Sequence, residues 1–193
     1  MRKNWAALAL TGMLCLTTFA GTQTVSAETA DSAKQVDIVF THDTHSHLNT
    51  FTTVVDDAEK EVGGFARINT LIQEQKAKNP DTLVIDGGDF SMGTLIQTVF
   101  ETQAAEIRML GYMGCDVTTL GNHEFDYRSK GLANMLNSAT ESGDNLPALV
   151  VCNVDWESME AAGLSEGQQL IRDAFDEYGV SDYVVLEKGD TDI

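Results

Sequence analysis

The chain has 193 residues, enough for one domain with a substantial hydrophobic core. Its 12 basic and 30 acidic side chains give a formal net charge of −18. This charge argues against an electrostatic grip on nucleic acid or on an anionic membrane. An anionic small substrate is still allowed, because bound metal cations can reverse the field inside a pocket.

Residues 1–27 have the pattern of a signal peptide. Arg2 and Lys3 supply a positive start, an apolar stretch runs over 5–19, and Val25-Ser26-Ala27 offers small residues for cleavage. A transmembrane anchor is the alternative, but threonines interrupt the apolar run and it is short for a span. We therefore expect an extracellular, periplasmic or cell-wall-associated protein with no transmembrane span after cleavage.

After the signal peptide, residues 28–35 are expected to form a flexible lead-in, and apolar runs then alternate with helical patterns. The predicted strands are 36–41, 82–86, 116–120, 148–154 and one beginning at 183–186. The predicted helices are 65–77, 94–110, 128–139 and 165–178. The first has an apolar side of Phe65, Ile68, Leu71 and Ile72. The last begins after Ser165 as its cap and has an apolar face of Leu170, Ile171, Ala174 and Phe175. This alternation predicts an α/β domain with a largely parallel sheet.

The polar segment 49–63 is expected to be a solvated loop, and Lys188-Gly189-Asp190 a turn. An α/β domain is not expected to stop just after that turn, with its last strand barely closed. We therefore expect the domain over 36–193 to be incomplete at its C-terminus.

The cysteines that remain after cleavage are Cys115 and Cys152. A secreted protein could pair them. However, Cys115 precedes one predicted strand and Cys152 ends another, and in a parallel sheet these are opposite ends. We expect two unpaired, mostly buried thiols.

All the histidines lie in two short windows, each directly after a predicted strand: His42, His45 and His47 in one, His123 in the other. Loops at the carboxyl ends of strands build the active sites of open α/β sheets. Asp43 and His45 are two residues apart, so they point the same way if the chain is still extended. A carboxylate and an imidazole that converge suit a first-row divalent metal. His42 and His47 are interpreted as solvated or supporting residues.

Two further windows carry oxygen and nitrogen ligands. In 86–89 (DGGD), the glycines allow a sharp turn, Asp89 is free to bridge two cations and Asp86 can support the site. In 121–126 (GNHEFD), Asn122 offers an amide oxygen to a metal and leaves His123 free for substrate. Asp126 can reach back to His123, fix its tautomer and raise its basicity. We expect no role in the chemistry for Glu124. It is interpreted as a residue that supports the metal ligands or as a negative charge at the start of a helix.

Together these motifs resemble the calcineurin-like metallophosphatases, in particular the secreted 5'-nucleotidase and 2',3'-cyclic-nucleotide phosphodiesterase branch. The resemblance covers residue 36 to the end of the chain. Its matching segments are FTHDTHSHL (40–48), GGFAR (63–67), DGGDFSMGT (86–94), GNHEFDY (121–127) and CNV (152–154).

The resemblance implies the N-terminal half of a four-layer αββα sandwich and two divalent metal ions (Zn, Mn, Fe or Co). Asp43 and His45 would hold the first metal, Asp89 would bridge, and Asn122 would hold the second. His123 would be catalytic, with Asp126 as its partner. Members of this family add downstream Gly-His and Gly-His-x-His segments and a nucleoside-selecting C-terminal domain, which this sequence lacks. The chain alone is therefore not expected to be active.

The implied reaction is hydrolysis of a nucleotide or other phosphate ester by attack of a metal-bound hydroxide, without a covalent enzyme intermediate. One alternative is the same scaffold acting on cyclic nucleotides or nucleotide sugars. Another is a fragment that binds metal or nucleotide without catalysis. The oligomeric state is left open.

Overall fold

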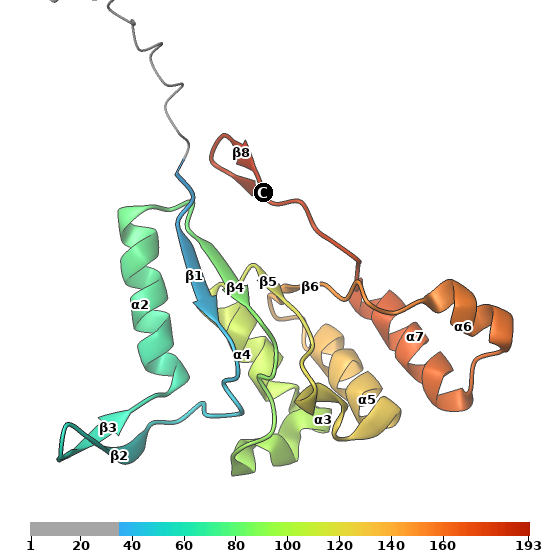
Figure 1. Cartoon of the computed structure of the whole chain (residues 1–193), viewed down its shortest axis with the longest axis horizontal. Coiled ribbons are helices and arrows are strands. Elements are labelled where there is room, and N and C mark those ends of the chain that lie inside the picture. Colours follow the sequence, from blue (N-terminus) through green and yellow to red (C-terminus); the bar gives the residue numbers. More distant parts are fainter. Residues whose placement is uncertain (1–34) are drawn as a thin grey trace, which may run out of the picture. The chain divides into compact units, whose positions relative to one another are not determined.

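The computed structural model describes residues 35–193 (Figure 1). The expected signal peptide, and all of the 28–35 lead-in except Gln35, lie outside the described residues. Within the described part, no helix is long and apolar enough to cross a membrane.

A four-stranded parallel sheet forms the centre of the domain, in the order β1-β4-β5-β6. Its strands are β1 (Ile38–Thr41), β4 (Leu83–Asp86), β5 (Val117–Thr118) and β6 (Ala148–Leu149). Helices connect successive strands, as crossovers between parallel strands require. The predicted α/β class and parallel sheet are confirmed.

The helices that pack beside the sheet supply most of the core. They are α2 (Phe65–Lys78), α4 (Ala105–Met113), α5 (Arg128–Glu141) and α7 (Glu166–Tyr178). Figure 1 shows α2 alongside β1, and α5 packs against α7. Ile72, Ile107 and Leu136 are fully buried, whereas Leu71, predicted on the inner side of α2, is 60% exposed. Ser165 caps α7 through a reciprocal capping box with Gln168.

The predicted loop over 49–63 is instead an antiparallel hairpin of β2 (Phe51–Val55) and β3 (Ala58–Val62). Asp56 and Asp57 form its two-residue turn, with φ of +54° and +59°. Positive φ at both central residues matches the twist of paired strands. Residues 49–63 lack the Asn-Gly or Asp-Gly pair that usually marks such a turn, so the sequence favours a loop there.

The single helix predicted over 94–110 is broken. A 3-10 helix, η1 (Leu95–Val99), leads into α3 (Phe100–Gln103), and α4 begins after Ala104. Ala104 is fully buried with φ of +47°, a left-handed conformation that ends α3 and redirects the chain. Tertiary packing therefore overrides the good helix propensity of alanine at this position.

The C-terminal part differs from the prediction in three elements. The strand over 148–154 shrinks to β6, and a short helix, α6 (Trp156–Ala162), follows it. The strand expected at 183–186 does not form, and a small hairpin of β7 (Glu187–Lys188) and β8 (Thr191–Asp192) lies beyond it. The turn expected at 188–190 joins these two strands.

Both cysteines of the described residues are free, as predicted. Cys115 is buried, and burial raises the pKa of its thiol to about 12. Cys152 is exposed, so the prediction that both thiols are buried is wrong for Cys152. The early end of β6 at Leu149 leaves Cys152 in an irregular segment outside the sheet.

Candidate metal centre

The three predicted motifs meet at one edge of the sheet, because they follow the carboxyl ends of the neighbouring strands β1, β4 and β5. Backbone hydrogen bonds join the first two loops directly. The amide of Asp43 donates to the carbonyl of Gly88 (3.0 Å), and that of His45 donates to the carbonyl of Asp89 (3.1 Å). Side chains far apart in sequence are thereby fixed in one cluster.

The first loop is not extended at Asp43 and His45, so the expectation of extended backbone there is wrong. Asp43, His45 and Ser46 have φ of +52°, +46° and +53°, in the left-handed region. Each such residue costs on the order of 1 kcal/mol and persists only where its surroundings fix it. The two side chains still converge, with Asp43 Oδ1 lying 3.5 Å from His45 Nε2.

The second loop turns sharply at Gly88, where φ is +85°. A Cβ at Gly88 would lie 2.6 Å from the backbone nitrogen of Gly121, and a Cβ at Gly121 would lie 2.1 Å from Asp89 Oδ1. Glycine at both positions thus lets the second and third loops touch. Asp89 lies at this contact, and its Oδ1 accepts a hydrogen bond from the amide of His123 (2.9 Å).

The third loop places His123 on a short 3-10 turn, η2 (His123–Phe125). The predicted contact is present: His123 Nδ1 lies 2.8 Å from Asp126 Oδ2. This hydrogen bond, together with the charge of Asp126, raises the pKa of His123 above its ordinary value. The proton on Nδ1 is held by the carboxylate, which leaves Nε2 as the free nitrogen of the ring.

Asn122 lies between these groups. With its amide oriented to satisfy its neighbours, Nδ2 donates to Asp89 Oδ2 (3.1 Å), and the amide oxygen faces the backbone nitrogen of His123 (3.3 Å). Asn122 is thus in direct contact with the carboxylate predicted to bridge two cations.

Three side chains form a donor cluster suited to a metal ion. Ligand atoms of His45, Asp89 and His123 all lie within 4.8 Å of one another. Imidazole nitrogen and carboxylate oxygen suit first-row divalent metals, so the donor set fits the ions that the sequence implies. Within residues 35–193 this is the one group of at least three such side chains. It includes His123, which the sequence assigned to catalysis, and it leaves out Asp43.

The other two histidines lie outside this cluster. His42 Nδ1 is 2.7 Å from Asp43 Oδ2, and this contact lowers the pKa of Asp43. His47 packs edge-on against Phe51, with ring centroids 5.4 Å apart. Both placements agree with the supporting or solvated roles expected for them.

Glu124 has the supporting role that the sequence suggested, but the sequence did not indicate which groups it supports. It is fully buried. Its Oε2 accepts from the amides of Asp89 (3.0 Å) and Gly121 (2.6 Å), and its Oε1 accepts from the amide (3.0 Å) and hydroxyl (2.7 Å) of Ser91. One carboxylate therefore ties the second loop to the third. No sequence signal predicts this, because two of its three partner residues lie 33 and 35 positions away.

Asp86 is the last residue of β4 and supports the loops of the site through hydrogen bonds, as the sequence suggested. Its carboxylate accepts from Thr41 Oγ1 (2.7 Å), the amide of Gly88 (3.0 Å) and Thr118 Oγ1 (3.0 Å). It thus joins β1, β4 and β5 at the point where their loops begin. Burial raises its pKa despite these bonds.

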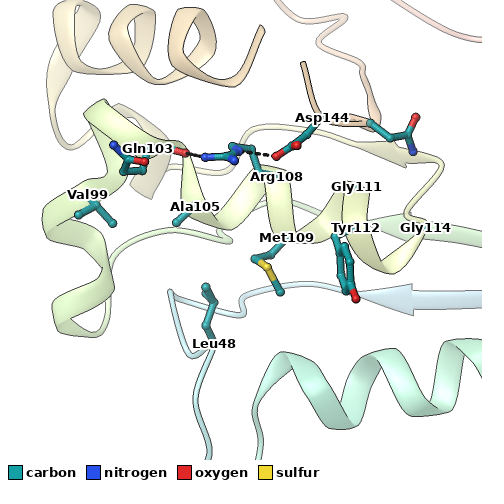
Figure 2. A pocket seen from close by; sticks show the side chains of 11 residues that line it. Leu48, Val99, Gln103, Ala105, Arg108, Met109, Gly111, Tyr112, Gly114 and Asp144 are labelled. Carbon is teal, nitrogen blue, oxygen red and sulfur yellow. Dashed lines mark hydrogen bonds and ion pairs between the residues drawn. The ribbon is translucent and has the colours of Figure 1, made fainter. Parts of the chain in front are cut away.

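Two cavities lie near this region, and only one touches the predicted site. A cavity of about 330 Å³ is lined by Asp43, His45, His47 and Phe51, among others. A larger cavity of about 750 Å³ runs along α4 and contains none of the predicted site residues (Figure 2). Its one cation, Arg108, is paired with Asp144 at 2.7 Å.

The fold and the cluster define an α/β protein with a candidate metal centre at the carboxyl edge of a parallel sheet. Comparison with known proteins shows which family within this class the chain belongs to. The chain matches the family described as calcineurin-like phosphoesterase over residues 36–189. The chain belongs to this family.

Several relatives of the chain are named as nucleotidases. It is 36% identical over 110 residues to the 5'-nucleotidase of Mus musculus, covering 55% of this chain and 19% of the relative. It is 29% identical over 187 residues to a 5'-nucleotidase-related protein of Glossina morsitans morsitans, covering 93% of this chain and 32% of the relative.

A solved structure shows the same arrangement of elements. The 5'-nucleotidase precursor from Thermus thermophilus superposes with a TM-score of 0.63 at 27% identity, over 81% of this chain and 27% of that one. The chain thus spans between about a fifth and a third of the length of the relatives described here.

Proposed function

We propose that this chain carries the metal-binding part of a secreted phosphoesterase that hydrolyses nucleotide phosphate esters with two divalent metal ions. The observation that carries the proposal is the convergence of His45, Asp89 and His123 on three loops that bear the family's motifs. The 5'-nucleotidase names of the relatives support a nucleotide as the substrate. The pattern of residues 1–27 supports secretion.

In this proposal the side chains have distinct tasks. Asp43 and His45 would hold one ion, Asn122 would hold the second, and Asp89 would be shared between them. Divalent ions bound there supply charge neutralisation for the phosphate and lower the pKa of a water molecule.

His123 is proposed to be catalytic. Asp126 holds the proton of Nδ1 and raises the pKa of the ring, so the imidazole stays protonated nearer neutral pH. Its Nε2 then donates a hydrogen bond to a phosphoryl oxygen or a proton to the leaving alkoxide.

His123 lies close enough to His45 and Asp89 to be a metal ligand, so its assignment as a catalytic residue needs a direct test. We expect Asp89→Ala to weaken binding of Mn²⁺ by at least about tenfold, because it removes a ligand. We expect His123→Ala to bind Mn²⁺ nearly as well as the wild type. Both would be measured by calorimetric titration of the metal-free chain. Equal loss of affinity in the two variants means that His123 is a ligand, and the separation of roles is then wrong.

Metal binding is also expected to stabilise the fold. A ligand at one hundred times its dissociation constant adds about 2.7 kcal/mol to the free energy of unfolding. Mn²⁺ or Zn²⁺ should therefore raise the melting temperature of the wild type more than that of Asp89→Ala. A wild type that melts at the same temperature with and without either ion contradicts the proposed metal centre.

The substrate is tested by phosphate release from AMP with added Mn²⁺ or Zn²⁺, beside a cyclic nucleotide and a nucleotide sugar. A binding fragment without catalysis is a second candidate, favoured by the single donor cluster in residues 35–193. Metal binding without release of phosphate from any of these substrates would support that candidate for the chain as it stands.

A further inference from the structure

A buried carboxyl group outside the predicted site lies against the first loop. Glu106, in the first turn of α4, is only 1% exposed. Its Oε1 accepts a hydrogen bond from the hydroxyl of Ser46 at 2.6 Å. Its Oε2 has no hydrogen-bond partner among the described residues. Burying a carboxyl group with one oxygen unsatisfied is unfavourable, so its presence here calls for a physical reason.

Ser46 is the residue that donates a hydrogen bond to this carboxyl group. It is fully buried and follows His45 in the left-handed stretch of the loop. Its amide donates to the carbonyl of Phe90 (2.8 Å), and its carbonyl accepts from Thr94 Oγ1 (2.7 Å). The bond to Glu106 completes the set, so every polar group of Ser46 has a partner. A left-handed conformation at a serine persists only under this kind of constraint.

We infer that Glu106 is a positioning residue for the metal centre. By accepting a hydrogen bond from the hydroxyl of Ser46, it fixes the left-handed turn that presents Asp43 and His45 to the metal. Among the described residues its side-chain hydrogen bond is to Ser46 and not to a proposed metal ligand, so it acts on the site through Ser46. The inference rests on the proposed function, because it assigns Glu106 to the same site.

The first test is a set of Mn²⁺ titrations of the 193-residue chain. Glu106→Leu keeps the bulk but removes the acceptor, and Ser46→Ala removes the donor. Each is expected to weaken Mn²⁺ binding by about tenfold or more, as loss of a group that orients a ligand does. Glu106→Gln keeps an acceptor and is expected to bind nearly as the wild type does. The Glu106→Leu/Ser46→Ala double variant should bind no more weakly than either single variant, because both act through one bond.

Thr82→Val is the matched control. Thr82 is also buried, and its hydroxyl donates to the carbonyl of Asn79 (2.7 Å) at the opposite end of β4 from the site. Loss of this bond is expected to leave Mn²⁺ affinity unchanged. The inference is overturned if Glu106→Leu binds Mn²⁺ as the wild type does, or if Thr82→Val loses as much affinity.

Hydrogen exchange tests the same inference without metal. The amides of His45 and Ser46 donate to the carbonyls of Asp89 and Phe90, so they report whether the turn is closed. In Glu106→Leu we expect these amides to exchange at least about tenfold faster, with β4 amides unchanged. Unchanged protection at His45 and Ser46 overturns the inference. A wild type that binds no Mn²⁺ refutes the proposed function, and the exchange comparison still decides the role of Glu106.

Discussion

Three buried carboxyl groups lie beneath the loops of the metal centre: Asp86, Glu106 and Glu124. A buried carboxylate is tolerated when hydrogen bonds replace its lost hydration. Glu124 accepts four such bonds and Asp86 accepts three, whereas Glu106 has one to Ser46. Glu106 is therefore the least compensated of the three.

This difference predicts that ionisation of Glu106 makes the free energy of unfolding depend on pH. Burial, with a smaller contribution from the nearby charge of Glu124, raises its pKa in the folded state. A carboxyl group with a raised folded pKa favours the fold below its unfolded pKa. That contribution is lost as the pH rises through the folded value. We expect Glu106→Gln, which cannot ionise, to gain stability relative to the wild type as the pH rises from about 4 to about 7.

Urea unfolding at a series of pH values measures this gain. Asp86, whose pKa is also raised, is present in both proteins and so cancels in the difference. If the unfolding free energy of Glu106→Gln minus that of the wild type stays constant or falls as the pH rises, the carboxyl group of Glu106 is not destabilised by burial.

At the scale of the element, the hairpin of β2 and β3 shows how turn residues set stability locally. Asp56 and Asp57 both adopt positive φ, which is less costly for Asp than for most residues but still unfavourable. Lys60 Nζ lies 3.0 Å from Asp56 Oδ2 and pairs with it across the turn. Asp57 has no such ion pair among the described residues, so it is the better position to change.

We predict that Asp57→Gly stabilises the hairpin by about 0.5 kcal/mol. Relief of the left-handed strain outweighs the extra chain entropy of glycine. Slower hydrogen exchange of the β2 and β3 amides would show the gain, since the hairpin can open locally without global unfolding. Glu59→Gly, within β3, is the control and should speed exchange. A faster rate in Asp57→Gly would contradict the prediction.

At the scale of the whole molecule, charge is the dominant feature. The 30 acidic side chains outnumber the 12 basic ones, so the folded chain repels itself at low ionic strength. The surface ion pairs that salt also weakens, such as Arg108 with Asp144, contribute little each. Screening should therefore stabilise the metal-free protein on balance.

We predict that the urea midpoint rises as NaCl increases from about 10 mM to about 150 mM, over which the Debye length falls from about 30 Å to about 8 Å. The rise should shrink at acidic pH, where the carboxylates are protonated. A midpoint that falls with salt at neutral pH would mean that specific ion pairs outweigh the net repulsion.

The sequence by itself determined the α/β class, the parallel sheet and the position of the site after successive strands. Apolar runs of strand length alternating with helical periods allow few other folds, and the carboxyl ends of parallel strands must share an edge. The contact of His123 with Asp126 was also predictable, because a spacing of three residues brings them together locally. These features depend on short segments whose pattern survives in any context.

The tertiary structure alone decided the features that depend on distant partners. The left-handed turn at Asp43, His45 and Ser46 is fixed by the backbone of the DGGD loop and by Glu106, 60 residues from Ser46. The break at Ala104 and the part of Glu124 in joining two loops likewise have no local signal. Local propensity covers a few residues, whereas a buried hydrogen bond is specified only when both of its partners have been brought together by the fold.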